Sequence, residues 1–107
     1  MASSSREPFQ SVLWPRAPRR VELGTLAKRH DSLEGKVIGQ LWDYLFRGDE
    51  IFPILERELG KRYPGVRFVN YDVFGSTHGD EERRVLEQLP EKLKRHKVDA
   101  VISGMAC

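Results

Sequence analysis

The side chain with the most distinctive chemistry is Cys107, the single cysteine of the sequence and its final residue. It follows an apolar segment over residues 98–103 and the turn Gly104-Met105-Ala106. This pattern predicts a thiol at the carboxyl end of a β-strand. A thiol in that place, near the start of a following helix, can have a lowered pKa and act as a nucleophile or redox centre. An inert, buried cysteine is the alternative, and the pattern leaves both readings open.

A second candidate, Asp43, comes directly after an apolar segment over residues 37–42. A carboxylate at the end of a strand can bind a ligand, orient a catalytic group or act as a general base. It can equally cap a loop by accepting hydrogen bonds from backbone N–H groups. We therefore predict a catalytic role for Cys107 and Asp43, with loop capping by Asp43 as the alternative.

A polar, glycine-flanked loop supplies candidate binding residues, namely Ser76, Thr77 and His78, and the turn residue Gly104 completes this set. The loop precedes a predicted helix, whose first N–H groups can hold a phosphate or carboxylate. The competing interpretation makes Ser76 or Thr77 a helix N-cap and leaves His78 as an exposed loop histidine. One cysteine rules out a disulfide framework and any zinc site built on several thiolates, and we expect no metal.

The elements that must position these residues alternate between strand and helix. Apolar runs predict strands near 36–42, 66–73 and 98–103, and helical spacing predicts helices near 49–62 and 80–96. We expect Pro90 to kink the second helix or divide it in two. The alternation indicates an α/β fold, a parallel βαβαβ sheet in three layers. All the candidate residues would then lie at the carboxyl edge of the sheet.

Composition divides the chain into two parts. Residues 1–32 form a Pro-, Arg- and Ser-rich arm, and residues 33–107 form the βαβαβ domain. A domain of this size is small for a finished doubly wound sheet, so we expect it to be incomplete at its C-terminus. A net charge of +2 gives no argument for nucleic acid, and no apolar run is long enough for a membrane. We expect a cytoplasmic protein that can self-associate, with the arm as one contact surface.

The segment Ser32-Leu33-Glu34-Gly35-Lys36-Val37-Ile38-Gly39, the aspartate after the first strand and the Gly-x-x-Cys ending resemble the UGSC family. That family is named for a Sec-Gly-Ser-Cys motif in which Cys can replace the first residue. The resemblance covers about residues 31–107 and implies half of a Rossmann-like or aspartate/glutamate racemase-like fold. The Gly-Ser-Cys part of the motif is absent here.

The resemblance implies a selenol- or thiol-dependent redox enzyme whose partners are a small-molecule substrate or a thiol reductant. Because UGA encodes selenocysteine and is also read as a stop, we expect a UGA codon next to the Cys107 codon, followed by codons for Gly-Ser-Cys. No other cofactor is expected, and the present fragment would be inactive alone. Two alternatives remain: a cofactor-independent racemase or isomerase that uses Cys in acid/base chemistry, and a non-catalytic α/β binding module.

Overall fold

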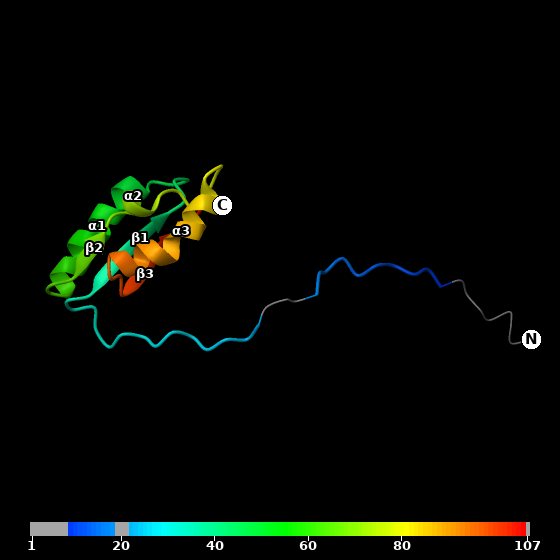
Figure 1. Ribbon diagram of the computed structural model, residues 1–107, viewed down its shortest axis with the longest axis horizontal. Helices are drawn as coiled ribbons and strands as arrows, with labels where there is room; N and C mark the ends of the chain where they lie inside the picture. Colours follow the sequence, from blue (N-terminus) through cyan, green and yellow to red (C-terminus); the bar gives the residue numbers. More distant parts are fainter. Residues whose placement is uncertain (1–8, 19–21, 107) are drawn as a thin grey trace, which may run out of the picture.

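The computed structural model describes residues 9–18 and 22–106. Its helices and strands follow one another in the order β1 (Val37–Trp42), α1 (Gly48–Arg62), β2 (Arg67–Val69), α2 (Tyr71–Phe74), α3 (Glu82–Arg95) and β3 (Ala100–Gly104). The described arm residues contain no helix or strand, and Figure 1 shows them leading away from the folded part.

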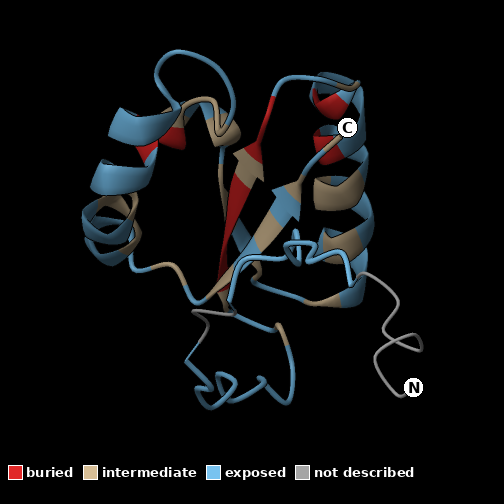
Figure 2. Cartoon of the chain, turned by 90° about the vertical axis from the view of Figure 1, so that its right-hand side faces the viewer, coloured by how far each residue is buried: buried red, intermediate tan, exposed pale blue. Residues whose placement is uncertain are grey.

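The three strands form one parallel sheet in the order β2-β1-β3. Val37 pairs with Arg67 on one side of β1, and Ile38 pairs with Ala100 on the other. Figure 2 shows the sheet edge-on, with helices on both faces: α1 covers one, and α2 with α3 covers the other. The predicted α/β fold and the parallel pairing of all three strands are confirmed. The chain passes from β1 to β2 on one side and then crosses to β3 on the other side of β1. The order of the strands therefore reverses between β1 and β3, and in open α/β sheets ligands bind at such a place.

The second strand is shorter than predicted. We expected it to run from residue 66 to 73, but β2 ends at Val69 and a short helix, α2, follows. Asn70 starts this helix, because its side-chain oxygen accepts a hydrogen bond from the backbone N–H of Asp72 at 3.1 Å. Phe74, at the end of α2, is 1% exposed. The apolar residues of this segment are therefore buried by a helical turn rather than by an extended strand.

The helix that contains Pro90 is also simpler than predicted. α3 is assigned as one helix from Glu82 to Arg95, so the expectation of two short helices is wrong. Proline removes one backbone hydrogen bond, and the rest of a fourteen-residue helix still packs through its apolar stripe. Val85 is buried in that stripe, and Lys92 of the same helix donates from Nζ to the carbonyl of Val73 at 3.0 Å. These contacts hold α3 against the layer that contains α2.

The core lies mostly on β1 and the helices next to it. Its buried apolar side chains are Val37, Ile38, Trp42, Phe52, Phe74 and Val85. Gln40 is fully buried in the same strand and donates from Nε2 to Glu56 Oε1 of α1 at 2.8 Å. The central strand is thus tied to α1 by a polar contact as well as by apolar packing.

Two glycines of α1 provide a matched test of this packing. A Cβ on Gly48 would lie 2.5 Å from the Trp42 ring, whereas a Cβ on Gly60 would meet no atom within 4 Å. We expect Gly48→Ala to lower the free energy of unfolding by about 1–3 kcal/mol through overpacking. Gly60→Ala should raise it by about 0.5–1 kcal/mol, because alanine is the better helix former. Urea denaturation of both variants measures the difference, and equal stabilities would contradict the close contact between Gly48 and Trp42.

Candidate functional site at the carboxyl edge

Asp43 lies at the centre of the carboxyl edge and is 5% exposed. It directly follows β1, and each of its carboxylate oxygens accepts one backbone hydrogen bond. Oδ1 accepts from the N–H of Leu45 at 3.0 Å, and Oδ2 accepts from the N–H of Ala106 at 2.6 Å. The first bond closes a local turn of the type that Asp often makes two residues ahead in the chain. The second hydrogen bond joins the end of β1 to the residues after β3, at the place where the order of the strands reverses.

The backbone around Asp43 strengthens the same connection. The N–H of Asp43 donates to the carbonyl of Gly104 at 3.3 Å. Asp43 and the segment 104–106 therefore contact each other through one backbone and one side-chain hydrogen bond. A Cβ on Gly104 would lie 2.6 Å from Phe46 Cζ, so this position admits no larger side chain without a shift of the ring. Gly104 is thus a close-packed part of the connection between β1 and β3.

The loop after α2 meets the same edge. Ser76 forms an isolated parallel bridge with Trp42, and the N–H of Thr77 donates to the Trp42 carbonyl at 3.1 Å. The Ser76 hydroxyl lies 3.4 Å from the Asp43 carbonyl and 2.7 Å from the His78 carbonyl. Ser76, Thr77, Asp43 and Gly104 are thereby brought together, as the parallel topology predicted. Neither Ser76 nor Thr77 caps α3, since that helix begins later, at Glu82, with Glu81 at its N-cap position.

The Asp43 carboxyl has an altered acidity. Burial by itself would raise its pKa, but the N–H groups of Ala106 and Leu45 donate to the carboxylate and hold its pKa below the usual value. The charge of His78 acts in the same direction. A carboxylate that is ionised at neutral pH and already accepts two backbone hydrogen bonds is better suited to hold the chain than to exchange protons. The geometry favours the capping and positioning interpretation of Asp43 over the general-base one.

Cys107, the other predicted catalytic residue, lies outside the described residues. Its neighbour Ala106 is described, and the Ala106 N–H is the group that Asp43 binds. Residue 107 is covalently joined to a backbone segment that the Asp43 carboxylate holds. The predicted roles of Cys107, Asp43, Ser76, Thr77, His78 and Gly104 in catalysis and binding remain predictions.

An aromatic cluster beside Asp43 was not predicted from the sequence. Trp42 is 6% exposed and stacks on Tyr44, with ring centroids 4.1 Å apart and planes 20° from parallel. Tyr71 packs edge-on against both rings, at 4.8 Å from Trp42 and 5.7 Å from Tyr44. Tyr44 has a φ of 62°, a left-handed conformation that is strained for a large side chain. The aromatic spacing at residues 42, 44 and 46 could have indicated this cluster, but the contribution of Tyr71 depends on the unpredicted helix α2.

The position of Tyr44 also affects its hydroxyl. Burial raises the pKa of Tyr44, and the neighbouring Tyr71 and Asp72 raise it further. The phenol is therefore protonated at neutral pH and can donate a hydrogen bond. Tyr44 is 44% exposed and directly follows Asp43 in the chain.

No group of three or more His, Cys, Asp or Glu side chains is placed to hold a metal ion among residues 9–18 and 22–106. Within that same part of the chain, every helix is too short or too polar to cross a membrane.

The fold and this edge define a parallel α/β unit in which a buried carboxylate joins the ends of two adjacent strands. Comparison with known families then identifies the chain more closely. The sequence model of the UGSC family matches residues 11–107, and the chain belongs to that family. The match includes most of the arm, which the resemblance over residues 31–107 did not cover. No curated protein and no solved structure matches the chain.

Proposed function

We propose that this chain forms the carboxyl-edge site of a selenol- or thiol-dependent redox enzyme of the UGSC family. The observation that carries the proposal is the 2.6 Å hydrogen bond from the Ala106 N–H to Asp43 Oδ2. A charge-assisted bond of this length is among the stronger ones in proteins, and it fixes the backbone immediately before residue 107. Membership of the family supports a chalcogen group after this strand, because the family is named for its Sec-Gly-Ser-Cys motif.

The proposed chemistry is exchange between a thiolate and a disulfide. The Cys107 thiolate attacks one sulfur of a disulfide, the S–S bond breaks, and the second sulfur leaves as a thiolate. The product is a mixed disulfide on Cys107, and the exchange itself changes no overall electron count. Residues 1–107 contain one cysteine, so a second thiol or selenol outside these residues resolves the mixed disulfide. A thiol reductant is accordingly the partner that we propose, with the polar groups of Ser76, Thr77 and Tyr44 as contacts for the substrate.

Thiol kinetics test this function. The rate at which Cys107 reacts with an aromatic disulfide is followed by absorbance, for the native chain and for the same chain in urea. We expect the native rate, corrected for the effect of urea on the reagent, to be at least about tenfold higher, because Asp43 holds the backbone that precedes residue 107 and so restricts the orientations open to the next residue. Equal rates in the two states, or no reaction of the native chain, would contradict the proposal.

Two variants distinguish the positioning role of Asp43 from a general effect of removing one carboxylate from the chain. Asp43→Asn keeps one acceptor oxygen and loses the second, whereas Asp49→Asn removes an exposed carboxylate at the start of α1. We expect Asp43→Asn to bring the native rate close to the unfolded rate and Asp49→Asn to leave it unchanged. Circular dichroism at the assay temperature shows whether each variant is still folded, so a loss of rate in a folded Asp43→Asn chain reports positioning.

Self-association is a separate proposal, supported by the arm. Its large apolar side chains lie in solvent, with exposed fractions of 99% for Phe9, 96% for Leu13 and 94% for Leu26. Full exposure of several such side chains favours their burial against another copy of the chain. We expect sedimentation velocity to show dimers or larger species for the full chain, and monomers when Phe9, Leu13 and Leu26 are all changed to Ser. A monomeric full chain would contradict this proposal.

A further inference from the structure

The outer side of β3 is an unprotected edge of the sheet. The order β2-β1-β3 gives β3 one neighbouring strand, and no strand pairs with its other side in the part of the chain that the structure describes. Proteins usually keep an edge strand from pairing further by making it short, charged or interrupted by proline. Residues 100–106 contain no charged residue and no proline, and Val101 and Met105 are 41% and 77% exposed. The edge of β3 is therefore available to a further strand.

The opposite edge of the same sheet is protected. β2 has only three residues and begins with the exposed Arg67. The helix α2 begins at Tyr71, so the chain leaves the extended conformation almost directly after β2. A short strand with a charge at its start offers little to a further strand. The lack of protection is thus particular to β3.

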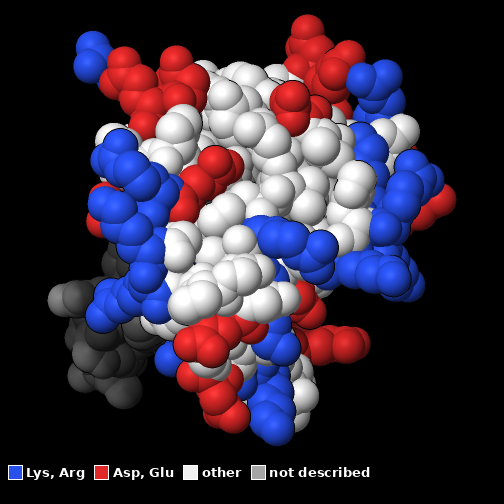
Figure 3. All heavy atoms as spheres, turned by 90° about the vertical axis from the view of Figure 1, so that its left-hand side faces the viewer, with Lys and Arg blue, Asp and Glu red and all other residues white. Residues whose placement is uncertain are grey.

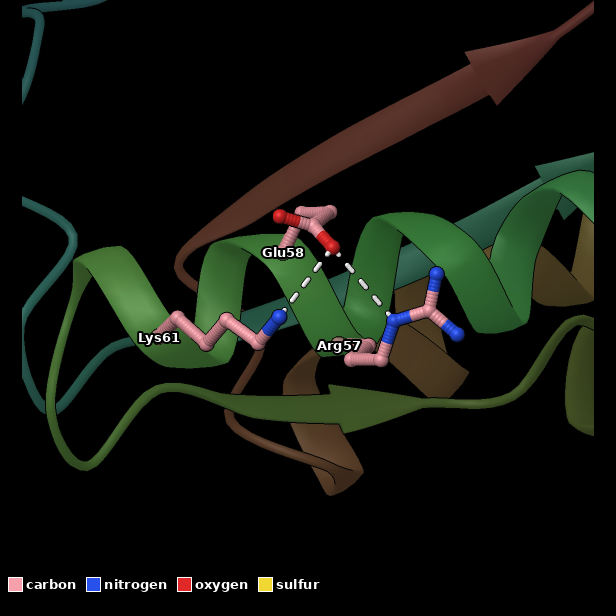
Figure 4. A network of polar contacts seen from close by, with 3 residues as sticks. All are labelled: Arg57, Glu58 and Lys61. Atoms are coloured by element: carbon pink, nitrogen blue, oxygen red, sulfur yellow. Dashed lines mark hydrogen bonds and ion pairs between the residues drawn. The ribbon is translucent and has the colours of Figure 1, made fainter.

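The outer faces of the two long helices differ from β3 in charge. On α1, Arg57 and Lys61 lie 3.4 and 3.5 Å from Glu58, as Figure 4 shows. On α3, Arg83 lies 3.4 Å from Glu87. Figure 3 shows charged side chains of both signs over much of the left-hand side of the molecule. Charged residues of both signs are typical of helix faces that contact water.

The arm contains a segment of the kind that pairs with a sheet edge. Residues 9–14 are uncharged and stand between Pro8 and Pro15 in the sequence. Aromatic and β-branched side chains, which suit a strand, make up half of this segment, and Pro15 favours an extended conformation at Trp14. The segment is neither helix nor strand in the structure. An extended segment that joins a sheet edge gains main-chain hydrogen bonds, which the surface of a helix does not offer.

The arm leaves the domain beside β3 and does not rest on its own domain. The His30 ring donates from Nε2 to the carbonyl of Asp99, the residue directly before β3, at 2.9 Å. Farther along the arm, Phe9 and Leu13 are 99% and 96% exposed, and Figure 1 shows the arm leading away from the folded part. The sequence model of the family includes residue 11 and all that follow, so most of the arm belongs to the family's own domain.

From these observations we infer that residues 9–14 of one copy pair with the outer side of β3 of a second copy. The inference rests on the self-association proposed above, and it names the surface that receives the arm. Six extended residues are about 20 Å long, close to the length of the five-residue β3. Residues 15–36 connect the segment to β1 and span at most about 70 Å, so the arm reaches a neighbouring copy. A symmetric pair exchanges two arms in this way.

A mixture of nitrogen-15-labelled and carbon-13-labelled full chains tests the contact directly. We expect isotope-filtered NOEs between residues 9–14 of one chain and residues 100–105 of the other. A monomeric chain would contradict the self-association itself. An associated chain whose intermolecular contacts lie elsewhere, or whose arm pairs with its own β3, would overturn this inference and leave self-association standing.

Proline substitutions in the arm separate strand pairing from general apolar attraction. Neighbouring N–H groups of a strand point to opposite sides, so either Val12→Pro or Leu13→Pro removes a hydrogen bond to β3. We expect the more affected of the two to raise the dissociation constant of the pair about tenfold. Thr25→Pro, in the arm but outside the segment, should leave it unchanged. Since the described arm has no helix or strand, these changes leave the domain folded, and equal dissociation constants for all three variants would overturn the inference.

A charge on β3 is the complementary test. Val101→Lys places an ammonium group on the edge strand, whereas Ile54→Lys places one on α1, where Ile54 is 48% exposed. We expect Val101→Lys to weaken association about tenfold or more, because a charge on an edge strand opposes pairing. Ile54→Lys should associate as the original chain does, and circular dichroism shows that both are folded. An equal loss in both folded variants, or none in Val101→Lys, would overturn the inference.

Discussion

Replacement of Asp43 by Asn should destabilise the fold and flatten its response to acid. Asparagine retains one acceptor oxygen, so either the N–H of Leu45 or the N–H of Ala106 loses its partner at a partly buried position. A donor left unpaired away from bulk water is costly, and we expect the thermal midpoint to fall by roughly 5 °C. Differential scanning calorimetry at neutral pH measures this change.

The pH dependence has a defined direction. The pKa of Asp43 is lower in the folded chain than its ordinary value of about 3.9 in an unfolded one. A group with a lowered pKa contributes stability that is fully present above the unfolded value and is lost as pH falls through the folded value. The original chain should therefore lose stability below about pH 4. Asp43→Asn should lose less over the same interval, and parallel acid curves for the two proteins would refute this assignment.

Phe74→Ala should have the largest effect on stability of any single change considered for this fold. Phe74 is 1% exposed, and its ring lies 3.3 Å from the place where a Cβ on Gly39 would stand. Removal of a buried phenylalanine typically costs about 3–5 kcal/mol, because a cavity remains where the ring was. Equilibrium urea unfolding measures this loss.

The loop at the carboxyl edge should respond as well. Phe74 ends α2, and Ser76 and Thr77 reach Trp42 just after it. We therefore expect faster amide exchange at Thr77 in any Phe74→Ala chain that remains folded. Leu86→Ala, at a residue of α3 that is 48% exposed, is the control and should change stability by about 1 kcal/mol or less. Similar losses in both variants would contradict the placement of Phe74 in the core.

Most of the fold could be predicted from the sequence because its strands are apolar and short and its helices amphipathic. The elements near 36–42, 49–62 and 98–103 agree with β1, α1 and β3 to within two residues. The segment 70–74 could not be predicted in the same way. Its alternating composition suits a strand, and only the cap at Asn70 and the burial of Phe74 favour a helical turn. Local capping and tertiary burial outweighed strand propensity there.

The candidate site was predictable in its location and less so in its contacts. A parallel sheet brings the ends of neighbouring strands to one edge, which is how Asp43 and Gly104 meet. Ser76 and Thr77 follow α2 instead of a strand, and they reach the same edge through their contacts with Trp42 and Asp43. The sequence cannot specify that the partners of Asp43 are backbone N–H groups, because every residue carries one. It also gave no sign that Tyr71 would join Trp42 and Tyr44, since that contact depends on α2.

The central claim is that the ionised Asp43 carboxylate holds the backbone ahead of residue 107. The most direct test is an NMR titration that follows the Asp43 side-chain carbon and the Ala106 amide proton together. We predict one common titration, with a pKa below the usual aspartate value, in which the Ala106 proton moves as the carboxylate becomes protonated. An Asp43 carboxyl with an ordinary or raised pKa, or an Ala106 amide that does not respond to it, would contradict the claim.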